Sequence, residues 1–165
     1  MTIAEVLLLD YDLEIQNTRR ILERIPEDNP QWKPHDKSMP IGRLAVHVAR
    51  LPLFGSTILT TDELDMTTAS PPKLVFESRE KLLAQHEETS ATTRKALESS
   101  SDDHLLKHWK LSFGDKIIAD GPRAVLYRTM FLNHLVHHRG QLTVYLRLNE
   151  IPVPGLYGPS ADEKL

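Results

Sequence analysis

Asn133-His134-Leu135-Val136-His137-His138-Arg139-Gly140-Gln141 lies at the centre of a stretch, Leu126 to Leu146, whose apolar and polar residues recur with a helical period. His134 and His138 are four residues apart, so a helix places both imidazoles on one face. The other residues predicted to share this face are Tyr127, Phe131, Gln141, Leu142 and Tyr145. Burying an unpaired polar group costs free energy, so each imidazole needs a partner. A shared metal ion and separate hydrogen bonds in the core are the two alternatives.

This fourth helix is expected to run from residue 122 to about 149, with Asp120-Gly121-Pro122 at its start and Pro152 beyond its end. A second apolar line, formed by Leu132, Val136 and Gly140, lies opposite the histidine face. A helix that is apolar on two sides is buried on both. We therefore expect two neighbours, of which one belongs either to the same chain or to a second subunit.

Composition excludes several classes of protein. The 165 residues are enough for one domain, 1–165, with a substantial core. A net charge of −3 gives no electrostatic footprint for nucleic acid. The chain has no cysteine, which excludes disulfides and thiolate ligands and fits a reducing cytoplasm. No apolar run approaches the ~18 residues of a membrane span, and the N-terminus lacks the basic start of a signal peptide. We expect a cytoplasmic protein that binds neither nucleic acid nor a membrane.

Two further helices are predicted in the first part of the chain. The first covers residues 3 to 25 and ends at Pro26. A loop, 26–39, follows, and its Trp32 is expected to fold back on one end of the core. The second helix begins at Pro40, with Ser38 or Met39 as its cap. Its apolar stripe consists of Leu44, Leu51, Phe54 and Ile58, with His47 at the centre. A third histidine therefore points at the core from a different helix.

The middle of the chain is predicted to contain a polar connection, a polar helix and a hairpin. Residues 60–70 form the connection, and the third helix runs from Ser70-Pro71-Pro72 to about Ser99, with His86 in its solvated middle. Polar and apolar residues alternate over 108–113, which indicates a half-buried strand. Gly114-Asp115 is a two-residue turn before the return strand, 116–119. The hairpin is expected to lay Trp109, Leu111 and Phe113 over one end of the helices. The predicted fold class is all-α, a four-helix bundle with a short β-hairpin before the last helix.

His47, His134 and His138 form the candidate metal site. A set of three histidines binds a divalent ion at ~2.0–2.1 Å per nitrogen, as for zinc, and leaves at least one position open. Nitrogen ligands alone do not choose among zinc, nickel, cobalt and iron, and zinc and nickel are the ions that we expect. His137 is expected to face solvent or a partner subunit, and Gln141 to hydrogen-bond a ligand or a bound water. Asp10 is the acidic residue that we can place on a core stripe.

Four segments resemble the DinB-like superfamily of small bacterial metal-binding bundles, and the likeness spans nearly the whole chain. They are Trp32, 42–49 (GRLAVHVA), 134–142 (HLVHHRGQL) and 157–163 (YGPSADE). The most specific part is one histidine on the second helix and His-x₃-His-Arg-Gly-Gln on the fourth. The resemblance implies that His47, His134 and His138 bind a divalent metal inside a four-helix bundle, usually in a homodimer. It also implies a low-molecular-weight thiol as a cofactor, because some relatives are thiol-dependent transferases.

Three interpretations follow. In the first, the protein is a metal-dependent enzyme, a thiol-dependent transferase or a hydrolase, that acts on a small molecule at an open three-histidine site. In the second, it is a non-catalytic, stress-related dimer that binds metal. In the third, it is a metal-free bundle with hydrogen-bonded core histidines. A fold and a metal do not define a reaction, and no residue specifies the substrate.

Overall fold

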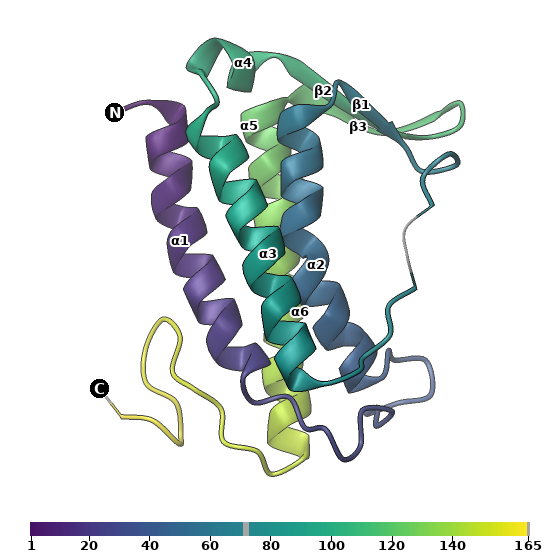
Figure 1. The fold of residues 1–165 in the computed structure, drawn as a ribbon, viewed down its shortest axis with the longest axis vertical. Coiled ribbons are helices and arrows are strands. Elements are labelled where there is room, and N and C mark those ends of the chain that lie inside the picture. Colours follow the sequence, from purple (N-terminus) through teal and green to yellow (C-terminus); the bar gives the residue numbers. More distant parts are fainter. Residues whose placement is uncertain (71–72, 165) are drawn as a thin grey trace.

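The protein is mostly helical, and its long helices lie side by side around one apolar core (Figure 1). The computed structural model describes residues 1–70 and 73–164. The helices are α1 (Ile3–Leu22), α2 (Ile41–Thr60), α3 (Arg79–Glu98), the short α4 (Asp102–Leu106), α5 (Arg123–Leu126), the π-helical η1 (Tyr127–Leu132) and α6 (Asn133–Leu148). None of the helices in the described part of the chain has both the length and the apolar character needed to cross a membrane.

The start of α2 differs from prediction, because backbone carbonyl groups and not a capping side chain accept hydrogen bonds from its first amides. Pro40 is the N-cap of α2 and neither Ser38 nor Met39 acts as one. The Ile41 N–H donates to Trp32 O (2.8 Å) and the Gly42 N–H to Pro30 O (2.9 Å), so the 26–39 loop itself satisfies the first amides of the helix. The same loop brings Trp32 against Tyr145, with ring centroids 5.7 Å apart, as expected of a residue that covers one end of the core.

Helix α3 begins at Arg79, about nine residues later than predicted. Residues 73–78 are extended, with alternating burial that leaves Val75 62% exposed while Leu74 and Phe76 pack on the core. Ser78 is the N-cap of α3 and accepts from the Lys81 N–H. The predicted start at residues 70–72 is therefore wrong at Ser70, and Pro71 and Pro72 lie outside the described residues.

One face of the polar middle of α3 is buried, and His86, which was predicted to be solvated, lies on that face. His86 is only 1% exposed, and its Nε2–H donates to Ile15 O of α1 (3.3 Å). The Thr89 hydroxyl donates to Ala49 O and the Thr93 hydroxyl to Pro52 O, both on α2. Small polar side chains let α3 approach α2 closely while their hydroxyl groups remain hydrogen-bonded. Low hydrophobicity on this helix therefore reflects a polar interface with α2 as well as a solvated outer face.

A three-stranded sheet covers one end of the helices (Figure 1). The predicted hairpin is confirmed as β2 (His108–Phe113) paired antiparallel with β3 (Lys116–Pro122), with Gly114 at φ +57 in the turn. Strand β1 (Glu63–Asp65), which was expected to be loop, pairs parallel with β2. Trp109 and Leu111 are buried, but Phe113 is 58% exposed. A register shift between Leu111 and Ser112 reverses the alternation, so Ser112 takes the buried place expected for Phe113.

The fourth helical segment is continuous from Arg123 to Leu148 but contains the π-helical η1. Its π-helical turn holds more residues than an α-helical one, so it rotates every later side chain relative to a uniform α-helix. Beyond Leu132, the predicted second buried line fails, because Val136 is half-buried and Gly140 is exposed. The fully buried positions of α6 are instead Leu135, Arg139, Leu142 and Leu146.

The π segment also brings α2 and η1 into close contact. Phe131 is fully buried and lies against Gly55, where an added Cβ would be 2.7 Å from its ring. Tyr127 and Tyr11 pack edge-on and tilted against the same ring, at centroid distances of 5.0 and 6.2 Å. This aromatic cluster fixes the start of α6 relative to α2, and so fixes the helix that carries two histidines against the helix that carries the third.

Candidate metal centre

The structure brings His47 of α2 together with His134 and His138 of α6. One ring nitrogen of each lies within 4.8 Å of those of the other two. The ring centroids are 5.3 Å apart for His47 and His134, 4.7 Å for His47 and His138, and 4.6 Å for His134 and His138. Within residues 1–70 and 73–164, they form the one group of three or more His, Cys, Asp or Glu side chains close enough to share a metal ion.

The spacing of one pair of histidines suits a tetrahedral ion. Two nitrogens that each lie 2.0–2.1 Å from a tetrahedral metal are about 3.4 Å apart. The observed separation of His47 Nε2 and His134 Nε2 is 3.4 Å. All three side chains are half-buried, so they are partly shielded from water but still reachable. The donor set and its spacing therefore fit a divalent ion that keeps at least one position for another ligand.

The environment keeps the three imidazoles neutral. Burial and the neighbouring histidines lower the pKa of His47 to about 4, and the positive charge of Arg43 contributes to the shift. Burial is also the largest cause that lowers the pKa of His134 and the pKa of His138. A metal binds only the neutral imidazole, so at neutral pH no proton has to be displaced before binding.

Gln141 orients one of the three rings. Its Oε1 lies 2.7 Å from His138 Nδ1, and its Nε2 lies 3.2 Å from His137 Nε2. A carbonyl oxygen accepts, so His138 carries its proton on Nδ1 and leaves the Nε2 lone pair for a metal. His137 itself is exposed, as expected. Gln141 therefore contacts a candidate ligand, as the sequence suggested.

We predict that Gln141→Leu weakens zinc binding about 10–100-fold, because loss of a partner that orients a metal-binding histidine has effects of this size. The unfolding midpoint of the metal-free protein should change little, since Gln141 lies at the edge of the core. Competition titration with a zinc chelator measures the affinity. Gln141→Glu keeps an acceptor oxygen and serves as the matched control. Equal affinity in wild type and Gln141→Leu would contradict the orienting role.

A cavity of about 670 Å³ opens beside the histidines, and His47 and His134 form part of its wall. Most of its remaining wall is apolar and comes from α2, from the sheet and from Met130 of η1. The cavity lies within the range of roughly 300–1,000 Å³ that is typical of small-molecule sites. A molecule that enters it would meet two of the three histidines.

The sheet builds one wall of this cavity. Leu64 of β1 and Leu111 of β2 both line it, as does Met66 just beyond β1. Asp65 clamps β1 to the hairpin, because its Oδ1 accepts from the Thr67 N–H (2.9 Å) and from the Gly114 N–H (3.0 Å). These backbone hydrogen bonds lower the pKa of Asp65. Asp65 thus binds both the segment that follows β1 and the turn of the hairpin, and so holds the two parts of the wall together.

Behind the histidines, Arg139 ties α6 to α1. Its side chain is 1% exposed, lies 2.6 Å from Glu14 Oε2 and donates to Glu14 O at 2.9 Å. It also donates to the Tyr157 hydroxyl, which in turn donates to Glu14 Oε2 (2.7 Å). Asp10, in contrast, lies on the surface and pairs with Arg128, so it is not the core acid that its position on the stripe suggested.

Three residues in or behind the site were not predicted from the sequence. Arg43 and Arg50 line the cavity beside His47. Their spacing from His47, four residues before and three after, places all three on one face of α2, and this signal was present in the sequence. Arg139 was also missed, because its partner Glu14 is 125 residues away in the chain.

Comparison with known proteins agrees with this architecture. A family model described as the DinB family matches residues 5–164. The uncharacterized protein YrdA of Bacillus subtilis (strain 168) is 24% identical over 158 residues, covering 94% of this chain and 89% of YrdA. Among solved structures, a DinB-like protein from Bacillus cereus ATCC 10987 has a TM-score of 0.70 at 22% identity, over 93% of this chain and 97% of that one. The DinB-like protein YjoA from Bacillus subtilis gives 0.68 at 18%, over 96% and 98%. These structures share the fold.

Proposed function

Because the chain belongs to the DinB family, we propose that it binds one divalent metal ion through His47, His134 and His138 and works as a metal-dependent enzyme. The reaction is a thiol-dependent transfer to a small organic molecule, or the hydrolysis of one. The observation that carries the proposal is the position of the histidine cluster in the wall of a cavity of about 670 Å³. A metal held there would be open to a second molecule.

In this proposal the scaffold is a four-helix bundle made of α1, α2, α3 and the helical segment from Arg123 to Leu148. Zinc and nickel are the expected ions, and the protein works in the cytoplasm. The site lies between α2 and α6, which the aromatic cluster around Phe131 holds at a fixed distance. Ligands on rigid helices are held more exactly than ligands on loops, which favours a preorganised centre.

The bound ion would supply Lewis-acid chemistry, either by lowering the pKa of a water toward about 7 or by holding a thiol as its thiolate. The chain's own residues have three tasks. The neutral imidazoles donate lone pairs, Gln141 fixes the ring of His138, and the apolar wall keeps bulk water away from the reacting groups. No carboxylate general base lines the cavity among the described residues, so we expect the ion and a thiol or water to provide the nucleophile.

The second candidate is a non-catalytic, stress-related homodimer that binds metal. Exposed apolar side chains on α1 and on the fourth helical segment favour a partner subunit there. They are Val6, Leu9 and Leu13 on α1, and Val125 and Val144 on the fourth segment, with exposures between 47% and 67%. Such side chains on two neighbouring helices are typical of a subunit interface. Dimerisation is compatible with both functions, so access to the metal decides between them.

Cobalt substitution separates the two candidates. We expect that protein loaded with Co²⁺ changes its visible absorption when a small thiol such as 2-mercaptoethanol is added, because an open position accepts the sulfur. The metal-free protein with the same thiol is the control. A spectrum that stays unchanged while cobalt remains bound would overturn the enzymatic proposal and support the non-catalytic dimer. A changed spectrum would justify a screen of thiol-transfer and hydrolysis reactions with the zinc-loaded and nickel-loaded protein.

A further inference from the structure

The cavity beside His47 combines an apolar wall with basic charge. Among residues 1–70 and 73–164, 14 line it: nine are apolar, three are basic (Arg43, Arg50 and Lys73) and two are histidines (His47 and His134). None of the lining residues in the described part of the chain is acidic. The chain as a whole carries a net charge of −3, so the charge of the cavity lining is opposite in sign to that of the whole chain. An electrostatic preference for anions is therefore local to the cavity.

Helix α2 presents these charges next to the metal centre. Arg43, His47 and Arg50 share one face of the helix at positions i, i+4 and i+7. At 1.5 Å per residue, Arg43 begins about 6 Å before His47 along the helix axis and Arg50 about 4.5 Å after it. The two arginines thus flank His47 along the helix, and both belong to the lining of the cavity that His47 lines.

Arg43 is available for a ligand. Its side chain is exposed at the cavity, and within residues 1–70 and 73–164 it makes no ion pair or hydrogen bond through its side chain. Its positive charge also acts electrostatically on His47, because it contributes to the lowered pKa of that side chain. A guanidinium beside an apolar wall offers two parallel N–H donors, which match a carboxylate.

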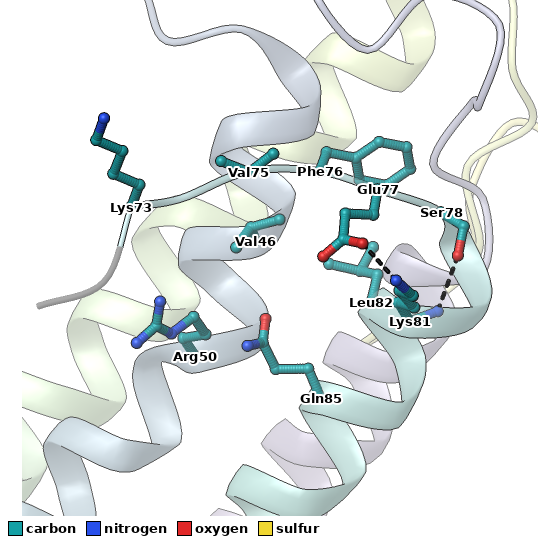
Figure 2. A pocket seen from close by; sticks show the side chains of 10 residues that line it. All are labelled: Val46, Arg50, Lys73, Val75, Phe76, Glu77, Ser78, Lys81, Leu82 and Gln85. Carbon is teal, nitrogen blue, oxygen red and sulfur yellow. Dashed lines mark hydrogen bonds and ion pairs between the residues drawn. The ribbon is translucent and has the colours of Figure 1, made fainter.

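A second groove of about 410 Å³ adjoins the first and shares Arg50 and Lys73 with it (Figure 2). There Glu77 is paired with Lys81, and the Lys81 N–H donates to the Ser78 hydroxyl. Figure 2 shows Arg50 beneath the extended segment that carries Lys73, whose own side chain points away from the groove. Glu77 neutralises Lys81 only, so Arg50 and Lys73 also leave this groove with an excess of positive charge, next to the basic cavity that His47 lines.

We propose that the cavity takes an amphipathic organic anion as its substrate or cofactor. The apolar body lies against Phe54, Leu64 and Met130, and a carboxylate is bound by Arg43 and Arg50. This inference rests on the proposed function, because it names the substrate class of the same site. The two arginines are specificity residues, since they select the charge of the ligand and leave the chemistry to the histidine centre.

Binding of a matched pair of probes tests the inference. Isothermal titration measures 4-phenylbutyrate and its neutral analogue 4-phenylbutan-1-ol on the full-length protein, both metal-free and zinc-loaded. We expect the anion to bind about 10-fold more tightly than the alcohol in both forms, which is the effect of one net charge-assisted contact. In Arg43→Gln/Arg50→Gln, the difference should fall to about twofold or less, with the affinity of the alcohol unchanged.

Lys95→Gln removes an exposed cation from α3, away from the cavity, and should keep the preference. The inference fails if the two probes bind equally, if neither binds at millimolar concentration, or if the double variant keeps the preference. A preference confined to the zinc-loaded form would assign the carboxylate to the metal and also overturn it. Metal content is measured on the same samples. An anion preference without metal binding would defeat the proposed function alone, and metal binding without an anion preference would defeat this inference alone.

Discussion

His47→Ala is expected to lose stoichiometric metal binding. Wild-type protein, incubated with zinc and passed through a desalting column, should retain about one ion per chain, because three neutral imidazoles lie close enough to share it. Removal of one ligand leaves His134 and His138 alone on α6. Removal of a residue that only hydrogen-bonds to a metal ligand lowers metal affinity roughly 10–100-fold. Because His47 is itself a proposed ligand, its removal should lower the affinity for zinc by more than this. Elemental analysis of untagged protein, together with a chelator titration, measures both quantities.

His137→Ala is the matched control, since His137 is a neighbour of His138 on the same helix but is exposed to solvent. It should keep the metal. Circular dichroism checks that both variants fold, and zinc at 100 times its Kd should stabilise wild type by about 2.7 kcal/mol but leave His47→Ala unaffected. If His137→Ala loses the ion while His47→Ala keeps it, the assignment of ligands is wrong. If wild type holds no ion either, the histidines are hydrogen-bonded core residues.

The helix face on which each of the three histidines lies could be predicted because it depends on helical periodicity alone. His134 and His138 fall on one face of any α-helix, and His47 lies at the centre of an apolar stripe, so neither placement needs knowledge of the tertiary structure. The β2–β3 hairpin could be predicted for the same reason, since alternation and a Gly-Asp turn are local signals. These are the parts of the molecule that short stretches of sequence encode by themselves.

Errors arose where distant parts of the chain supply the partner. His86 was expected in solvent because its neighbours are polar, yet those neighbours bind backbone carbonyl groups of α2 that no local pattern reveals. Strand β1 exists because β2 lies beside it, and its three residues carry no strand signal of their own. The π segment at Tyr127–Leu132 changes the phase of the fourth helix, and a period of 3.6 residues does not reveal it. Strand β1 and the π segment both contribute to the cavity wall, through Leu64 and Met130.

Arg139→Met is expected to lower the free energy of unfolding by about 3 kcal/mol. Removing one member of a buried ion pair typically costs about 3–5 kcal/mol, because the remaining charge stays buried without its partner. The lower end applies here, since the Glu14 side chain is 14% exposed and its other partner, Tyr157, lies at the surface. Urea denaturation followed by tryptophan fluorescence measures the change. The C-terminal segment should also become sensitive to protease, because Tyr157 loses a hydrogen bond to Arg139.

Arg147→Gln serves as the control for this prediction. Arg147 lies two turns further along α6 and also binds the C-terminal segment, through Asp162, but its side chain is 47% exposed. A surface ion pair contributes about 0–1 kcal/mol, so a small change is expected.

Glu14→Gln/Arg139→Met should be less destabilised than the sum of its two single variants, by about 1 kcal/mol or more, because the uncompensated charge is gone. Additive effects would show that Arg139 acts through packing and not through its charge. Metal content should stay unchanged in folded Arg139→Met, since Arg139 faces α1 while the histidines face α2. Loss of both stability and metal would show instead that the α1–α6 contact also positions His138.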